Sequence, residues 1–185
     1  MPDSLDDRLL ENGDIADLAE AIALHRSALD HCPASHSNRS NSYHGLALCL
    51  WRRYSEQATV PDLKEAITLG RSALELRSQG HSGCAAALNN PAEYLSDRFM
   101  NVGASADLDE AIVLHRSALD LRPTGHPDRS TLLNHLMDCL SSRFEKQEVE
   151  TDLDELITLQ RAILDIRPLG YSDHLASLHT LLRHI

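Results

Sequence analysis

Aromatic residues are scarce in this chain of 185 residues, where Phe, Trp and Tyr together make up only 4% and Trp occurs once. Apolar residues as a whole reach 42%, which is enough for a folded core. The core must therefore be built mainly from Leu, Ile and Ala. Because Leu and Ala are good helix formers, and residues that favour strands are few, the composition favours an all-α fold.

Positive charge is also in short supply. The 17 Lys and Arg residues stand against 28 Asp and Glu residues, which gives a net charge of −11. The basic residues form no patch, so we expect no binding to nucleic acid or to an anionic membrane. No apolar run approaches the roughly 18 residues of a membrane-spanning helix. The first ten residues lack the basic and apolar regions of a signal peptide, and we expect a cytoplasmic protein.

Motifs for chemistry are missing as well. The four cysteines, Cys32, Cys49, Cys84 and Cys139, form no Cys-x-x-Cys pair, and we expect reduced thiols in the cytoplasm. The 11 histidines include no His-x-x-x-His or His-Glu-x-x-His pair, and the eight glycines are scattered rather than gathered in a phosphate loop. The sequence therefore predicts no catalytic, cofactor or metal site, and a protein that is not an enzyme.

What the chain does contain is a repeat with a period of 45 residues and no insertion or deletion between copies. Segments between these copies also align, and in them Arg53, Arg98 and Arg143 share one register. The four clearest copies are DLAEAIALHRSALD from Asp17, DLKEAITLGRSALE from Asp62, DLDEAIVLHRSALD from Asp107 and DLDELITLQRAILD from Asp152.

Each unit reads as two helices joined by a short loop. In the second helix we expect the leading Asp to be the N-cap, with a Glu three residues later completing a capping box, as in Asp107 and Glu110. Apolar residues at i, i+3 and i+4 spacing form one stripe on each helix, and two such helices cannot bury their stripes alone. Stacked antiparallel helix pairs are therefore predicted. The predicted units are 1–34 (partial), 35–79, 80–124 (degenerate), 125–169 and 170–185 (a truncated first helix), all within a single array over 1–185.

The pattern resembles the tetratricopeptide repeat (TPR), in the long form found in kinesin light chains and in fungal tandem arrays. The resemblance is carried by LNHLMDCL (133–140) in a first helix and EAIVLHRSALDLRP (110–123) in a second helix. It implies an α-solenoid that winds as a right-handed superhelix. The length of 45 residues, against about 34 in the usual repeat, implies an extra helical turn after Leu140, a longer hinge and a longer loop between units.

The chain departs from the family pattern in several places. The aromatic position of the second helix is filled by His25, Gly70, His115 and Gln160. Because Gly and Gln fill the same position, we expect the two histidines to be packing residues rather than catalytic ones, although each is followed by Arg and Ser. Pro91 stands inside a first helix, and we expect a kink there or a helix that starts near it.

Charged residues also recur along the second helices. Arg26, Arg71, Arg116 and Arg161 each have an acidic residue four positions later, which predicts a surface ion-pair ladder. The alternative is an arginine stripe for an anionic ligand. At the C-terminal end, Leu175–Ile185 carries an apolar stripe with no second helix after it. Three alternatives remain open here: an imperfect cap, a piece of a longer array, or self-association through this helix.

The resemblance implies a non-enzymatic scaffold that binds a partner peptide or helix in a concave groove lined by the first helices. The alternative is a regulatory or sensor segment of a larger protein with a caspase-like or nucleotide-binding domain. The groove positions carry acids and no lysine, which disfavours a clamp for a C-terminal carboxylate and favours a polar or basic peptide. Trp51 is either an exposed anchor or a core filler. The family's groove positions fall on Asn41, His44, Leu48, Trp51, Asn89, Glu93, Ser96, Asp97, Asn134, Asp138 and Ser141.

Overall fold

The computed structural model describes residues 15–31, 33, 38–76 and 84–166, and within them every regular element is an α-helix. The chain divides into two compact units, Met1–Tyr94 and Leu95–Ile185, each of which is considered by itself. No described helix is long and apolar enough to cross a membrane. The predicted terminal pieces 1–34 and 170–185 lie partly or wholly outside the described residues.

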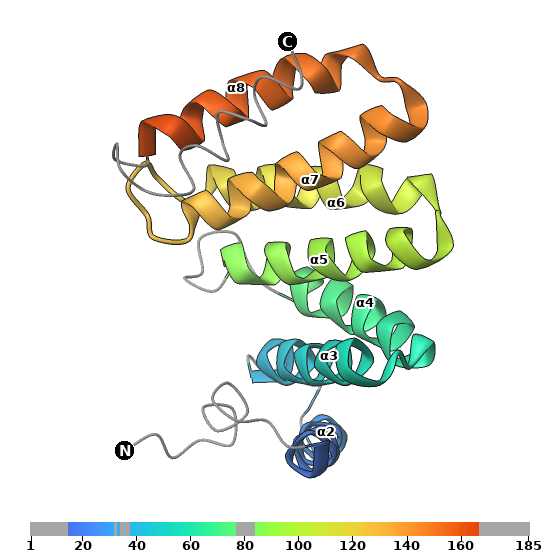
Figure 1. The fold of residues 1–185 in the computed structure, drawn as a ribbon. Coiled ribbons are helices and arrows are strands. Elements are labelled where there is room, and N and C mark those ends of the chain that lie inside the picture. The colour runs from blue at the N-terminus through green and yellow to red at the C-terminus, as the bar shows by residue number, and fades with distance from the viewer. Residues whose placement is uncertain (1–14, 32, 34–37, 77–83, 167–185) are drawn as a thin grey trace. The chain divides into compact units, whose positions relative to one another are not determined.

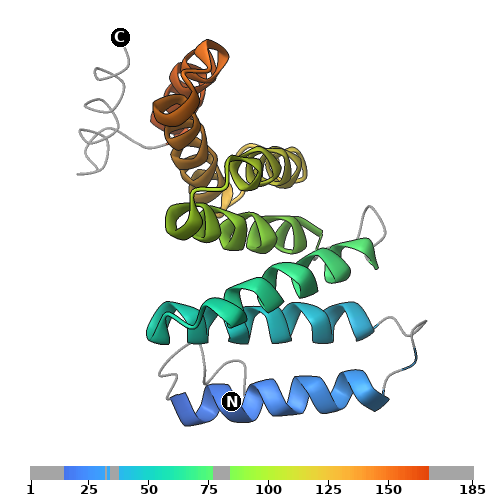
Figure 2. The ribbon, with the colours of Figure 1, turned by 90° about the vertical axis from the view of Figure 1, so that its right-hand side faces the viewer.

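The first unit contains α2 (Ile15–His31), α3 (Asn38–Gln57), α4 (Val60–Glu75) and the first part of α5 (Cys84–Val102). Helix α3 packs against both α2 and α4, as Figures 1 and 2 show from two sides. The stripes predicted from spacing form this contact, because Leu, Ile and Ala recur on the faces that meet. The most buried of these residues are Leu18, Ala21 and Ile22 of α2, Leu46, Ala47 and Leu50 of α3, and Leu63, Ala66 and Ile67 of α4.

The second unit contains the rest of α5, then α6 (Ser105–Asp120), α7 (Arg129–Gln147) and α8 (Glu150–Ile166). Helix α7 packs against α6 and α8, which repeats the arrangement of the first unit (Figure 1). The first helix α7 continues past Leu140 to Gln147, so the predicted extra turn is confirmed. The core is again aliphatic: Leu108, Ala111 and Ile112 of α6, Leu132, Leu133, Leu136 and Leu140 of α7, and Leu156 and Ile163 of α8 are buried.

The two helices of a pair are joined by a loop of only two residues, so the expectation of a longer hinge is wrong. The first loop residue has a positive φ each time, 54° at Ala58, 75° at Gly103 and 52° at Glu148. Its N–H donates to the carbonyl of the residue four before it, over 2.7, 2.6 and 2.8 Å respectively. This left-handed cap ends the first helix and turns the chain directly into the second.

The predicted capping box is wrong. Helix α6 begins at Ser105, and Asp107 lies inside its first turn, buried, with only 4% of its surface exposed. Its carboxylate instead accepts two hydrogen bonds from Arg98, at 2.7 and 2.6 Å. Arg53–Asp62 and Arg143–Asp152 repeat this bidentate pair at the same separation of nine residues. The arginines that recur at this position of the repeat thus form ion pairs that connect the two helices of each pair.

Pro91 does not delay its helix. Helix α5 begins at Cys84 and continues through Pro91 to Val102, so the predicted late start is wrong. The proline ring lies beside Gly70 of α4, where a Cβ added to the glycine would come within 2.9 Å of the proline Cγ. The two unusual residues of this repeat are therefore complementary in shape, since the missing side chain of one leaves room for the ring of the other.

In the repeats on either side, the position of Gly70 is occupied by histidine. On α2, His25 packs over Gly45 of α3, where an added Cβ would come within 2.4 Å of the ring. On α6, His115 is 1% exposed and its ring centre lies 5.6 Å from that of His135 on α7. His115 is thus a packing residue, as predicted, and the size of its partner changes from repeat to repeat.

The predicted ion pairs four residues apart are wrong where the structure gives the partner. Arg26 of α2 donates two hydrogen bonds to Glu65 of α4, at 3.0 and 2.9 Å. Arg116 of α6 binds Glu155 of α8 in the same bidentate way. These arginines therefore connect second helices of successive pairs, because the guanidinium reaches a neighbouring helix instead of the next turn of its own.

Candidate functional site

All the predicted groove residues lie on first helices. Asn41, His44, Leu48 and Trp51 belong to α3; Asn89, Glu93, Ser96 and Asp97 belong to α5; Asn134, Asp138 and Ser141 belong to α7. Asn41 and Asp138 are exposed and the other nine are half-buried. The boundary between the two units falls within α5, after Tyr94, so these residues are described as two half-sites, one in each unit.

In the first unit, Trp51 connects α3 to α5. Its ring centre lies 5.7 Å from that of Tyr94, with the planes tilted by 35°. Tyr94 is 1% exposed, and this burial raises the pKa of its hydroxyl well above the ordinary value of 10.0. Trp51 is half-buried, so it is neither a fully exposed anchor nor a core residue. One face of it belongs to the packing between helices.

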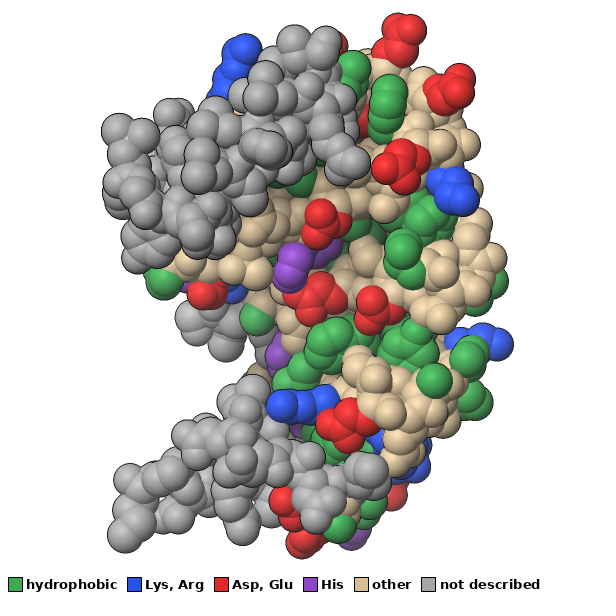
Figure 3. Space-filling view, viewed as in Figure 1, with side chains coloured by type: hydrophobic (Ala, Val, Ile, Leu, Met, Phe, Trp, Pro, Cys, Tyr) green, Lys and Arg blue, Asp and Glu red, His purple; other side chains and the backbone are tan. Residues whose placement is uncertain are grey.

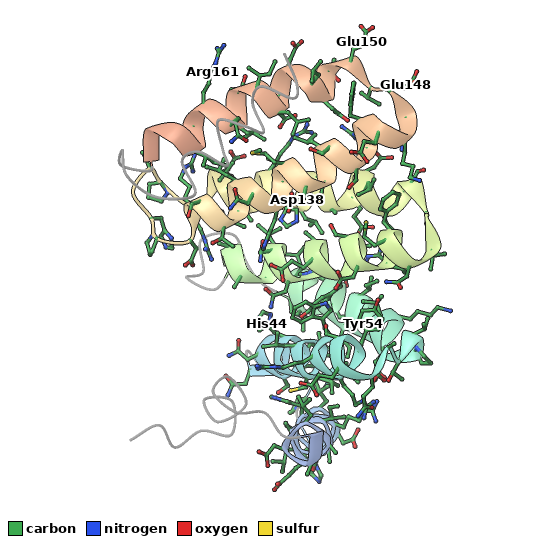
Figure 4. All side chains as sticks on the ribbon, in the orientation of Figure 1. His44, Tyr54, Asp138, Glu148, Glu150 and Arg161 are labelled. Atoms are coloured by element: carbon green, nitrogen blue, oxygen red, sulfur yellow. The ribbon has the colours of Figure 1, made fainter. Side chains whose placement is uncertain are left out.

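On α5 the predicted site residues also contact each other. The Asn89 side-chain amide donates to a carboxylate oxygen of Glu93 over 2.7 Å, one turn further along the helix. This bond fixes the amide, whose oxygen is buried in the first unit. On α3, His44 is half-buried, and Figure 4 shows it in the N-terminal half of the helix.

In the second unit, Ser96 and Cys139 join α5 to α7. The Ser96 hydroxyl and the Cys139 thiol lie 3.0 Å apart, and burial raises the pKa of the Cys139 thiol. Cys139 is therefore a packing residue with little thiolate character at neutral pH. Beside it, Asp138 projects from α7 (Figure 4). The surrounding protein raises the pKa of its carboxyl, and nearby His135 acts in the opposite direction.

The surface over these helices is acidic. Figure 3 shows Asp and Glu side chains, with histidine between them, gathered over α5 and α7. None of the predicted groove positions is Lys or Arg. A charged ligand at either half-site would therefore meet carboxylates, which favour cations.

The repeated His-Arg-Ser stretch, which resembled a set of catalytic residues, is divided among structural contacts. In α6, His115 packs on His135, Arg116 binds Glu155, and the Ser117 hydroxyl donates to the Val113 carbonyl of its own helix over 2.9 Å. Three consecutive helical positions face about 100° apart, so their side chains reach different neighbours. In the described part of the chain no three His, Cys, Asp or Glu residues come together as a metal site.

Sequence reasoning missed two residues that complete these half-sites. Tyr94 aligns with Cys49 and Cys139 in the repeat, and it is the residue against which Trp51 packs. His135 precedes Leu136 in the buried stripe and influences the charge of Asp138. The signal for Tyr94 was available, since it lies only two residues before Ser96, the repeat equivalent of the only tryptophan, in a chain poor in aromatics.

Comparison with known proteins supports the architecture. No protein-family model matches the chain, and no curated protein matches it. Among solved structures, it is similar to the nearly identical TPR-like repeats of a candidate kinesin light chain from Podosopora anserina. The TM-score is 0.68 at 19% identity, over 97% of this chain and 82% of that one. With seven described helices, the chain has the fold of TPR-like repeats.

Proposed function

We propose that the protein is a non-enzymatic scaffold that binds a polar or basic segment of a partner protein along its first helices. TPR-like repeats are typically protein-interaction scaffolds, and the chain has this fold. The observation that carries the choice of partner is the charge of the half-sites: Glu93, Asp97 and Asp138 are acidic, and none of the predicted groove positions is basic. Carboxylates on a partly buried surface attract Lys and Arg side chains and suppress binding of acidic segments.

Amides beside these acids would fix the backbone of the partner. Asn89 and Asn134 occupy equivalent positions on α5 and α7, and Asn41 of α3 lies three residues before their equivalent, His44. A side-chain amide can donate to one peptide carbonyl and accept from one peptide N–H. Repeated amides therefore suit an extended or helical peptide irrespective of its sequence, with the acids selecting its charge.

The proposal is tested with a set of labelled peptides of equal length whose net charge runs from acidic to basic, using fluorescence anisotropy. Basic peptides should bind more tightly than acidic ones, and added salt should weaken the binding. Asp138→Lys should reduce the affinity for basic peptides, while Asp120→Lys, at an exposed position on α6, serves as the matched control. Preference for acidic peptides, or equal loss in the two variants, would contradict the proposal.

The array over 1–185, its cytoplasmic location and the alternative of a regulatory segment of a larger protein stay predictions. The reading frame around the encoded chain distinguishes the last of these: a neighbouring protease or nucleotide-binding domain would favour the regulatory alternative.

A further inference from the structure

The two half-sites differ in aromatic content. Trp51 is the only tryptophan of the chain, and it lies on α3 of the first unit. Its repeat equivalents on α5 and α7 are serines, Ser96 and Ser141, and both belong to the second unit. The predicted groove residues therefore include one large aromatic ring, and that ring belongs to the first half-site.

The indole of Trp51 is held in place by α5. Its ring centre lies 5.7 Å from that of Tyr94, with the two planes tilted by 35°. Tyr94 is 1% exposed, so the packed interior fixes its position and it supports the indole from one side. Trp51 itself is half-buried, so part of its ring remains at the surface of the first half-site. A ring that is fixed by a buried neighbour and still partly exposed can stack with a planar group of a ligand.

A carboxylate lies beside this pair of rings. Glu93 directly precedes Tyr94 on α5 and is half-buried. Burial is the main cause of the raised pKa of the Tyr94 hydroxyl, and the negative charge of Glu93 adds to it, which places the carboxylate close to Tyr94. The Asn89 amide donates to Glu93 over 2.7 Å and restricts its rotation. The first half-site thus combines a partly exposed indole with a negative charge on the helix that the indole contacts.

An indole ring and a carboxylate together suit one kind of side chain best. A cation is attracted both by the face of the ring and by the negative charge. Of the two basic side chains, arginine is favoured, because its planar guanidinium stacks on aromatic faces and is less strongly hydrated than the ammonium of lysine. The half-buried positions of Trp51 and Glu93 increase this difference, since lysine would lose more of its hydration on entering.

We propose that the first half-site binds an arginine side chain of the partner segment, with the guanidinium stacked on Trp51 and attracted by the Glu93 carboxylate. This inference rests on the proposed function, because it names one residue of the basic partner. The second half-site has serines in place of the tryptophan, and it accepts arginine and lysine alike through Asp97 and Asp138. The partner is therefore a basic segment in which one arginine cannot be replaced by lysine without loss of affinity.

Two peptides of the same length test the proposal, one with arginine and one with lysine at every basic position, and neither containing tryptophan. In fluorescence anisotropy with labelled peptides, the arginine peptide should bind about fivefold more tightly, as expected for a cation–π contact at a partly exposed ring. Trp51 also reports binding directly, because it is the only tryptophan. At saturation the unlabelled arginine peptide should change its emission more than the lysine peptide does.

Substitutions of the ring locate the preference. Trp51→Leu should lower the affinity for the arginine peptide to that for the lysine peptide, whereas Trp51→Phe should retain part of the preference, since a phenyl ring still presents a face. Asp138→Lys, in the second unit, is the matched control: it should weaken the binding of both peptides equally and keep the preference. Circular dichroism checks that each variant keeps its helices.

The possible results separate this inference from the proposed function. Equal affinity for the two peptides would overturn the arginine subsite and leave the scaffold function standing. So would binding without a change in Trp51 emission, or a preference that survives Trp51→Leu. Failure of both peptides to bind would overturn the proposed function and the arginine subsite together.

Discussion

Replacing Arg143 by Met should destabilise the second unit severely, because it removes one partner of a buried ion pair. Arg143 donates to both carboxylate oxygens of Asp152, at 2.9 and 2.7 Å, and to Asp109 at 2.7 Å. The Asp152 side chain is 1% exposed, so without the guanidinium its charge stays in a site that water does not reach. Breaking a buried pair in this way costs about 3–5 kcal/mol. Because Arg143 itself is 16% exposed, we expect a value near the lower limit, about 3 kcal/mol.

The matched control is Arg116→Met, which breaks the pair with Glu155. There the side chains are 44% and 28% exposed, and the loss should stay below about 1 kcal/mol. Urea unfolding followed by helical circular dichroism measures both, with the slope of each transition checked so that a change in cooperativity is not mistaken for a change in free energy. Adding Asp152→Leu to Arg143→Met should recover most of the loss, since no buried charge then remains. Equal losses for the Arg143 and Arg116 variants, or no recovery in the double variant, would refute the reasoning.

Other substitutions test other parts of the fold. Gly70→Ala should cost roughly 1–3 kcal/mol, because the new Cβ would lie 2.9 Å from the Pro91 ring; adding Pro91→Ala should reverse this, and a double variant as unstable as the single one in urea would disprove the contact. Glu148→Gly should stabilise by about 0.5–1 kcal/mol, because Glu148 has a φ of 52° that glycine adopts freely, whereas Glu148→Ala should give no such gain in melting temperature. Although the Asp138 side chain is exposed, the protein around it partly desolvates its carboxylate and raises its pKa, so its contribution to stability is present below the ordinary pKa of 3.8 and is lost as the pH rises through the folded-state pKa. Asp138→Asn should therefore raise the urea midpoint at pH 7 and leave it unchanged in strong acid; the same gain at both pH values would contradict this cause.

The fold could be predicted largely from the sequence because its main determinants are local and repeated. Apolar spacing along the chain set the faces that pack, and a strict 45-residue period gave the described helix pairs the same pattern. The burial of Leu108, Ile112 and Leu136 and the length of α7 follow directly from that pattern. The candidate site could be predicted only as positions on first helices, and its binding role stays a prediction.

Partners of charged side chains could not be predicted in this way. Arg26 has an acidic residue four positions later on its own helix, and Asp107 stands near a helix start. Spacing along the chain therefore predicted an ion pair within one helix for Arg26 and an N-cap for Asp107. In the structure Arg26 reaches Glu65 and Asp107 receives Arg98. A long guanidinium can reach several carboxylates at similar distances along the surface, and only the placement of neighbouring helices decides among them.

The burial of individual apolar residues could not be predicted from spacing either, as Leu119 and Ala28 show. Both belong to the predicted stripes, yet Leu119 is half-buried and Ala28 is exposed, so a Leu119→Ala change should cost less than the 2–5 kcal/mol of a fully buried site. By itself the sequence determined helices, their pairing and their order, since these depend on spacing within a few turns. The tertiary structure alone decided which acids the arginines bind, how Gly70 accommodates Pro91, and how deeply each apolar residue of the described helices is buried, because each depends on residues that only folding brings together.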